Sequence, residues 1–339
     1  MLKLGVLDQT PVVPGETAVS ALRHTLELAR LADRLGFTRY WVSEHHDTPG
    51  LAGSSPEVLL AAIGAHTKRI RIGSGGVLLP HYSPYKVAEN FRVLEGLYPG
   101  RVDLGIGRAP GGMPTASRAL RKGYPKEPDA RYPESLRELA AYLQIGEPFP
   151  AGHPYAELKA TPVVDTAPDV WLLGSGEYSA AVAAQLGAGF SFAHFINADG
   201  GQEAVRRYFR EFRPGPLGRT PKANVCVTVI CADTDEAAER EAKATDLRLL
   251  YFARGELGRG FPTLEEAEAY PYEDWERELV KGNRKRMIVG GPDRVHAELA
   301  ALAESYGVDE ALATCILSDY RGRLRCYELL AGIFPQNRS

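Results

Sequence analysis

Residues 70–107 read IRIGSGGVLLPHYSPYKVAENFRVLEGLYPGRVDLGIG, and this stretch decides the fold. A short apolar run comes first, a helical pattern that opens at Ser83-Pro84 follows, and a second short apolar run ends the stretch. Serine before a helix and proline in its first turn are a common start of an α-helix. A strand, a helix and a second strand in this order predict two parallel strands joined by a right-handed crossover.

The same alternation of short apolar runs and helical patterns continues to both ends of the chain. Such alternation predicts parallel strands in either an open doubly wound sheet or a closed barrel. The sequence offers eight strand candidates, and eight units favour an α/β fold of the (β/α)8 TIM barrel type. The candidates are KLGVLD (3–8), RYWVSE (39–44), IRIGSGGVLL (70–79), RVDLGIG (101–107), VWLLG (170–174), GFSFAHF (189–195), NVCVTVIC (224–231) and EALATCI (310–316).

The length and the long loops indicate the domain organisation. A chain of 339 residues suits one barrel, so we expect a single domain over residues 1–339. Two stretches exceed normal loop length: residues 109–132, which are rich in glycine and proline, and residues 254–286, which are polar. Long excursions inside a compact domain are commonly functional lids or disordered segments. We expect residues 254–286 to form such a lid, in which glycine and proline break regular structure and charges keep the open segment solvated.

The composition excludes several classes of function. Hydrophobic residues make up 44% of the chain and charged residues 24%, with a formal net charge of −3, as in a globular protein with a sizeable core. The sequence has no basic tract of the kind that binds nucleic acids. No apolar run approaches the roughly 20 residues that span a bilayer, and the N-terminus does not resemble a signal peptide. The four cysteines lack metal-like or disulfide-framework spacing. We expect buried, reduced thiols in a cytoplasmic protein, with Cys226 and Cys231 on opposite faces of one strand.

Unusual residues collect where the strand candidates end, which is where barrel enzymes carry their active sites. Glu44-His45-His46 ends the second strand. Histidine suits acid–base chemistry near neutral pH, although polar residues at a strand end also simply hydrogen-bond the backbone. A metal site is the weaker alternative, because adjacent strand residues point to opposite faces and the histidines form no HxH or HExxH pattern. We therefore expect no metal.

Two glycine-rich segments follow the third and fourth strands. Gly75-Gly76 interrupts a buried strand and favours a β-bulge, with close approach of a flat ligand as the alternative. GIGRAPGG (105–112) lacks the GxGxxG spacing, and Met113-Pro114 follows where a nicotinamide-binding fold needs a helix. A plain glycine-rich turn is therefore favoured there.

The stretch LLGSGEYSAAVAAQLG (172–187) predicts a strand, a turn of small residues and a helix that begins near Glu177. The free backbone N–H groups at such a helix start attract anions. Ser175 and Tyr178 add hydroxyl donors, and Arg108 could add a bidentate charge from the neighbouring strand end. Together these groups would suit one phosphate, and a capped helix beside a surface arginine is the alternative.

In their order and spacing, these segments resemble the bacterial luciferase-like flavin monooxygenase family over almost the whole chain. The resemblance is greatest to the single-subunit bacterial members. It implies a (β/α)8 barrel with FMN at the mouth, in agreement with the independent strand count. The most specific parts are YWVSEHH (40–46), SPYKVAENFRVLEGLYPGRVDLGIGRAPGG (83–112), WLLGSGEYSAAVAAQLG (171–187) and RLRCYELLAGIF (323–334).

The resemblance also implies roles for single residues. His45 matches the active-site histidine that assists flavin oxygen chemistry, with Glu44 and His46 as its neighbours. Gly75-Gly76 matches a small-residue pair joined by a non-proline cis peptide behind the flavin ring. Residues 254–286 match a mobile segment over the site. The residues that match the phosphate-binding positions are Arg108, Ser175, Gly176 and Tyr178.

A member of this family would take reduced FMN from a separate, transiently bound flavin reductase. The reduced flavin would react with O2 to a flavin peroxide that oxidises a small apolar substrate such as an aldehyde. The family also implies a homodimer. Gly107 stands where the light-emitting luciferase subunit has a reactive cysteine, which argues against light emission. The rival functions are a deazaflavin-dependent hydride-transfer oxidoreductase of the same fold, a flavin-binding protein without turnover and a metal-dependent barrel hydrolase.

Overall fold

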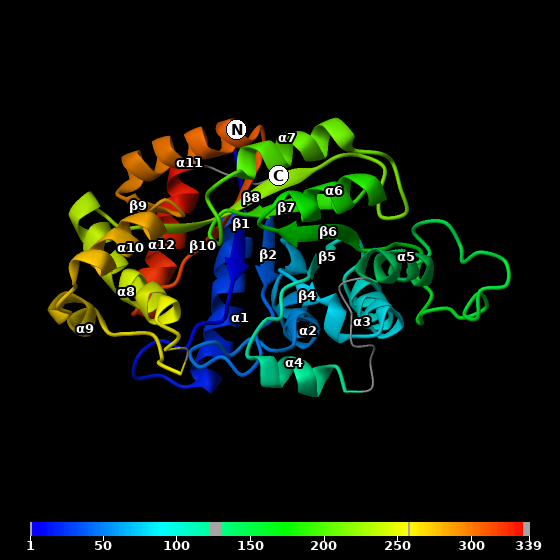
Figure 1. Ribbon diagram of the computed structural model, residues 1–339, viewed down its shortest axis with the longest axis horizontal. Coiled ribbons are helices and arrows are strands. Elements are labelled where there is room, and N and C mark those ends of the chain that lie inside the picture. Colours follow the sequence, from blue (N-terminus) through cyan, green and yellow to red (C-terminus); the bar gives the residue numbers. More distant parts are fainter. Residues whose placement is uncertain (1, 123–130, 257, 335–339) are drawn as a thin grey trace.

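The computed structural model describes residues 2–122, 131–256 and 258–334. At its centre, parallel strands form a closed eight-stranded barrel with helices around it (Figure 1). The barrel closes where β10 pairs with both β1 and β8. This architecture confirms the predicted (β/α)8 barrel. The barrel strands are β1 (Lys3–Asp8), β2 (Arg39–Val42), β3 (Arg71–Ser74) with its continuation β4 (Val77–Leu78), β5 (Val102–Gly107), β6 (Asp169–Gly174), β7 (Gly189–Ala193), β8 (Ala223–Cys231) and β10 (Glu310–Thr314).

The helices begin and end where the sequence supplies caps. The first helix starts at a capping box, in which the Thr17 and Ser20 side chains each accept a hydrogen bond from the other residue's backbone N–H, and Gly36 ends it with φ of 87°. The helices beside the strands are α1 (Ala18–Leu35), α2 (Pro56–His66), α3 (Pro84–Leu97), α5 (Tyr132–Tyr142), α6 (Glu177–Leu186), α7 (Gly201–Glu211), α8 (Asp235–Ala253), α11 (Pro292–Tyr306) and α12 (Tyr320–Ile333).

β3 and β4 form one barrel strand that is interrupted at Gly75-Gly76. Gly73 pairs with Asp103 and Val77 pairs with Ile106. Between these two pairs, the interrupted strand has one residue more than β5. One extra residue of this kind is a β-bulge. The predicted bulge is therefore confirmed.

The last third of the chain differs from what the sequence led us to expect in two ways. Residues 254–286 are not irregular throughout, because they contain α9 (Leu264–Ala269) and α10 (Asp274–Arg284), and this segment packs on α8 around its own apolar cluster. The strand β9 (Met287–Gly290) was not expected; it pairs in parallel with the last residues of β8, outside the closed barrel. A four-residue apolar run directly after a charged segment is too short to be recognised by periodicity.

The other long excursion, residues 109–132, contains the short helix α4 (Pro114–Leu120). Residues 123–130 of this excursion lie outside the described residues. A short 3-10 helix, η1 (Leu79–His81), leads from β4 toward α3. Among the described residues, no helix has the length and apolar character needed to cross a membrane.

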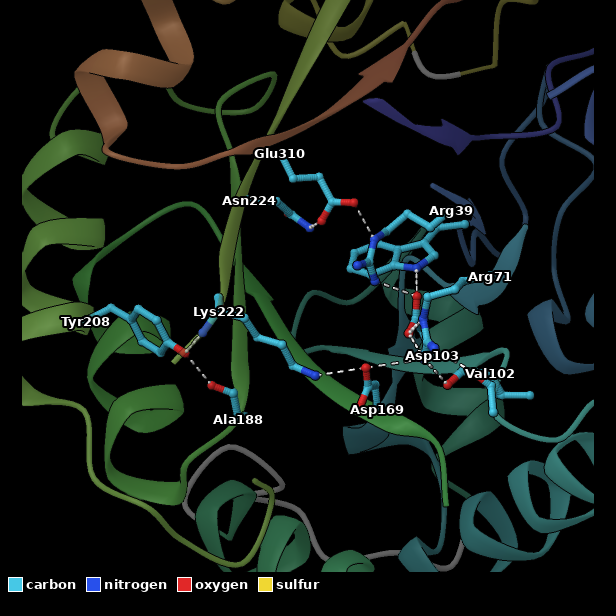
Figure 2. A network of polar contacts seen from close by, with 12 residues as sticks. Arg39, Arg71, Val102, Asp103, Asp169, Ala188, Tyr208, Lys222, Asn224 and Glu310 are labelled. Atoms are coloured by element: carbon cyan, nitrogen blue, oxygen red, sulfur yellow. Dashed lines mark hydrogen bonds and ion pairs between the residues drawn. The ribbon is translucent and has the colours of Figure 1, made fainter. Parts of the chain in front are cut away.

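Charged side chains gather at the N-terminal end of the barrel (Figure 2). Asp103 is fully buried and accepts hydrogen bonds from Arg39 Nη1 at 2.6 Å and from Arg71 Nη2 at 2.7 Å. Glu310 accepts one from Arg39 Nε at 2.8 Å, and Lys222 pairs with Asp169 at 2.9 Å. These residues stand at or before the first residues of their strands, where barrel residues serve stability and not catalysis. The active site is therefore expected at the opposite end.

The four cysteines are free and buried, as predicted. Cys226 belongs to a small apolar cluster inside the barrel, while Cys231 belongs to the larger core between the barrel and the helices. The two thiols thus lie on opposite faces of β8, as their spacing in the sequence predicts. The cluster inside the barrel also contains Leu7, Trp41 and Leu312.

Candidate active site

A cavity of about 450 Å³ lies at the C-terminal ends of the barrel strands, where barrel enzymes carry their chemistry. At its inner end it is lined by apolar residues of the cluster inside the barrel, including Leu7, Trp41 and Leu312. Toward the rim it is lined by residues that directly follow the strands. Pockets of this size with an apolar lining and a few polar groups are typical of sites for small molecules and cofactors.

His45 lines this cavity, and its Nδ1 lies 3.1 Å from the Ser43 hydroxyl oxygen. The strand end is held by the His45 backbone N–H, which donates to the Gly53 carbonyl at 2.8 Å. Burial, with the nearby His46 as a second cause, lowers the pKa of His45 to about 4. The imidazole is therefore neutral near pH 7 and can accept or relay a proton at Nε2 without first losing one.

Glu44 and His46 are joined to each other beside His45. His46 Nε2 lies 2.7 Å from Glu44 Oε1, and the same carboxylate accepts hydrogen bonds from the Tyr82 hydroxyl at 2.7 Å and the Leu78 backbone N–H at 3.0 Å. Burial raises the pKa of Glu44. Glu44 and His45 both line the cavity, whereas His46 does not, so the expected alternation of adjacent residues does not hold for Glu44 and His45. Glu44 and His46 tie the end of β2 to β4 and η1 and thereby position His45.

These contacts do not support the alternative of a metal site. In residues 2–122, 131–256 and 258–334, no group of three or more histidine, cysteine or carboxylate side chains is arranged to hold a metal ion. Glu44 already has three hydrogen-bond partners within the protein.

Gly75 and Gly76 line the cavity and are joined by a cis peptide bond, as the family resemblance implies. A larger residue would clash at either position, most severely at Gly76, where the neighbouring atoms are backbone. A Cβ on Gly76 would lie 2.7 Å from the Gly105 carbonyl oxygen, and one on Gly75 would lie 2.5 Å from Leu7 Cδ1. Both clashes are with the protein itself. A valine at position 76 would therefore disturb β5 before it reached a ligand.

The segment predicted to bind phosphate lies at the rim of the same cavity. Ser175 lines it directly after β6, and Arg108 lines it directly after β5. Gly176 is the N-cap of α6 and makes no side-chain cap, so the first N–H groups of this helix are left without that partner. A Cβ on Gly176 would meet no atom within 4 Å, which leaves the approach to these N–H groups open.

Tyr178 acts on Arg108 instead of lining the cavity. The Arg108 guanidinium carbon lies 4.3 Å from the centre of the Tyr178 ring, and the tyrosine is 45% exposed. A cation stacked on an aromatic ring in this way is held in one orientation. Neither Gly176 nor Tyr178 is among the lining residues, whereas Arg108 and Ser175 are.

Several lining residues were missed by the sequence reasoning. Ser179 lies one helical turn beyond Ser175 on α6, and helical spacing could have identified it. Ser43 precedes Glu44-His45-His46 and contacts His45. Others depend on packing between distant strands and give no local signal: Gln9, Ser191, Phe195, Ile196 and Cys226.

The chain is similar in sequence and fold to several known proteins. The family model described as luciferase-like monooxygenase matches residues 2–310. The uncharacterized protein YwcH of Bacillus subtilis is 50% identical over 334 residues, covering 98% of this chain and 99% of YwcH. The N-acetyl-S-alkylcysteine monooxygenase of the same organism is 38% identical over 333 residues, covering 98% of each chain. The crystal structure of apo-MsnO8 is 40% identical, covers 99% of each chain and has a TM-score of 0.90.

More distant solved structures share the fold alone. The oxygenating constituent of 3,6-diketocamphane monooxygenase from Pseudomonas putida, solved in complex with FMN, is 22% identical with a TM-score of 0.70 and covers 97% of this chain and 96% of its own. A secondary alcohol dehydrogenase that depends on the coenzyme F420 is 16% identical with a TM-score of 0.66 and covers 100% of this chain and 99% of its own. The same barrel therefore holds different coenzymes in different proteins.

Proposed function

Because the chain belongs to the luciferase-like monooxygenase family, we propose that it is an FMN-dependent monooxygenase that oxidises a small, largely apolar substrate with O2. Reduced FMN would supply the electrons that activate oxygen. The observation that carries the proposal is the arrangement of one cavity. It has an apolar inner end, a neutral histidine after β2 and an anion-attracting helix start after β6, three strands further along the sheet.

The residues present fit FMN. The apolar side chains at the inner end and the glycine backbone of the bulge offer surface to a flat ring system. Arg108, Ser175 and Ser179 would hold the phosphate together with the first N–H groups of α6. These residues would hold the phosphate at the rim, and the apolar inner end would accommodate the ring.

His45 would hold or move a proton at Nε2, since Nδ1 is taken by Ser43. A neutral imidazole is suited to this task because it can accept a proton from a reacting group and return it. The apolar lining around it would keep water from the reacting atoms. Glu44 and His46 would hold the ring of His45 in place from behind.

The substrate is proposed from the lining and from one relative. Phe195 and Ile196 leave an apolar wall next to the proposed flavin position, which suits the body of an aldehyde or a thioether. The relative that acts on N-acetyl-S-alkylcysteines supports a sulfur-containing substrate. A homodimer is part of the same proposal, and light scattering of the purified protein tests it.

Titration followed by absorbance tests the choice of coenzyme. We expect FMN to bind more tightly than riboflavin, because the site offers a phosphate cradle, and reduced FMN to bind more tightly than F420. Tighter binding of F420 would replace the proposal by deazaflavin-dependent hydride transfer. Tight FMN binding without oxygen consumption for any aldehyde or thioether would favour a flavin-binding protein without turnover.

A separate reductase is the second part of the proposal. With FMN, oxygen and reduced nicotinamide, the pure protein should consume nicotinamide slowly, and a flavin reductase from any source should accelerate it. The reason is that the glycine-rich turn after β5 lacks the fingerprint that binds a dinucleotide, and Pro114 begins the short helix behind it. Rapid consumption by the pure protein would contradict the two-component mechanism.

A further inference from the structure

A second cavity of about 120 Å³ adjoins the first, and Gln9 and Phe195 line both. It lies between α8, β8 and the end of β10, because its lining includes Thr245 and Arg248 of α8, Thr228 of β8 and Thr314 of β10. We call it the side pocket. A molecule that occupied the main cavity could extend one end into it.

Two arginines border the side pocket without a carboxylate partner among the described residues. Arg248, which is 6% exposed, donates to the carbonyl oxygens of Pro49 at 3.0 Å, Gly260 at 3.1 Å and Arg259. Arg286 donates to the Ile196 carbonyl oxygen at 3.0 Å and to the side chain of Asn283. These oxygens satisfy N–H groups but do not neutralise the charges. Burial accordingly lowers the pKa of both arginines.

Arg92 of α3 is also buried without an ion pair among the described residues and donates to backbone carbonyl oxygens, but it lines neither cavity. Two other buried arginines show the contrast. Arg39 pairs with Asp103 at 2.6 Å and with Glu310 at 2.8 Å, and Arg323 pairs with Asp8 at 2.6 Å. A buried charge without an opposite charge is costly, so proteins pair it or use it to bind an anion. The side pocket is therefore bordered by two arginines whose positive charges no carboxylate among the described residues neutralises.

Hydroxyl groups in the same place also lack partners. The Thr314 Oγ1 atom is fully buried and has no hydrogen-bond partner among the described residues, although nearly all such groups in proteins have one. Thr228 is half-buried in the middle of a barrel strand, and its side chain makes no hydrogen bond within the described part of the chain. Both hydroxyls can donate to an oxygen anion.

We propose that the side pocket binds a carboxylate of the substrate, held by Arg248 and Arg286 and by the Thr228 and Thr314 hydroxyls. The rest of the substrate would pass Gln9 and Phe195 to reach the flavin in the main cavity. This inference rests on the proposed function and narrows it. The substrate is then an anion with an apolar body, and an uncharged aldehyde would leave both arginines unpaired.

The phosphate of FMN is the other anion to consider. Its proposed cradle is formed by Arg108, Ser175 and Ser179, none of which lines the side pocket. The cradle follows β5 and β6, whereas the side pocket follows β8 and β10. The two anion sites therefore lie at different strand ends, and a substrate and FMN could be held together.

Calorimetric titration of the cofactor-free protein with matched acids and amides tests the side pocket. Hexanoate and benzoate should bind at least about tenfold more tightly than hexanamide and benzamide, because hydrogen bonds to charged groups contribute roughly 1.5–3 kcal/mol. Arg286→Gln should reduce the preference for each acid over its amide severalfold, because Arg248 still supplies one charge, and Arg286→Lys should keep more of the preference. Lys281→Ala, which removes an exposed charge of α10, is the matched control and should change nothing.

Three results would overturn the inference. Equal binding of acids and amides to the wild-type protein would do so, and so would a preference that is undiminished in Arg286→Gln. A loss of affinity for FMN but not for riboflavin in Arg286→Gln would show that the pocket holds the cofactor phosphate instead. If the acids are preferred while FMN does not bind the wild-type protein at all, the side pocket stands and the proposed function fails.

Discussion

His45 is neutral because burial and its neighbour His46 lower its pKa to about 4. A histidine whose pKa is lowered becomes positively charged only as the pH falls toward that lower pKa. We therefore expect the part of the turnover rate that depends on His45 to be constant between pH 6 and 8. His45→Ala should bind FMN like the wild type and lose on the order of a hundredfold in turnover, as expected for one acid–base group. A wild-type profile that titrates near 6.5 and disappears in the variant would show an ordinary imidazole instead.

Arg108 has the most direct link to the phosphate. Arg108→Ala should weaken FMN by about tenfold or more, because a charged donor to phosphate contributes roughly 1.5–3 kcal/mol, and should leave riboflavin affinity unchanged. Tyr178→Leu should have a smaller effect in the same direction, because the ring only orients the guanidinium at 4.3 Å. Fluorescence titrations with both ligands measure this. An equal loss for FMN and riboflavin in Arg108→Ala would mean that the arginine does not contact phosphate.

At the scale of elements, the segment 254–286 consists of two parts. The helices α9 and α10 pack on α8, whereas residues 258–262 carry no helix or strand, and Gly258 and Gly260 have open space around them. Trypsin should therefore cut first after the exposed Arg259, before any site in α10 such as Lys281. Because Arg248 holds the Arg259 and Gly260 carbonyls near the side pocket, bound ligand should slow that cut. A first cut within α10, or a rate insensitive to FMN and hexanoate, would count against a lid at 258–262.

The same elements show what the sequence could predict. The order of strands and helices follows from local periodicity and caps. The sequence therefore predicts the barrel and the residues at the strand ends that form the site, including Glu44-His45-His46 and the start of α6. The reason for the glycines in the bulge could not be predicted from the sequence, because their neighbours Gly105 and Leu7 come from other strands. The side pocket was not readable either, since Arg248, Arg286 and Thr314 meet only after α8 packs on the barrel.

At the scale of the whole molecule, a buried network joins the first and last units of the barrel. Asp8 at the end of β1 accepts hydrogen bonds from Arg323 of α12 at 2.6 Å, from Thr25 of α1 at 2.7 Å and from Tyr40 of β2. Arg323 also donates to the Cys315 carbonyl at 2.8 Å. Segments more than three hundred residues apart in sequence are thus fastened together next to the barrel closure between β1 and β10.

This network should make folding stability sensitive to acid. Burial alone would raise the pKa of Asp8, but Arg323 and the hydroxyl donors outweigh it and lower the pKa. The stabilisation is then fully present above the unfolded pKa of about 3.9 and is lost as the pH falls through the lower folded value. Asp8→Asn should cost about 3–5 kcal/mol in urea unfolding at pH 7, because it leaves the Arg323 charge buried alone, and the difference from the wild type should shrink below pH 4. Asp309→Asn removes the exposed pair with Lys3, whose side chains are 73% and 56% exposed, and should cost less than about 1 kcal/mol. If both variants lose the same small amount, or if the Asp8→Asn difference stays constant down to pH 3, the fastening of the two ends does not depend on this ion pair.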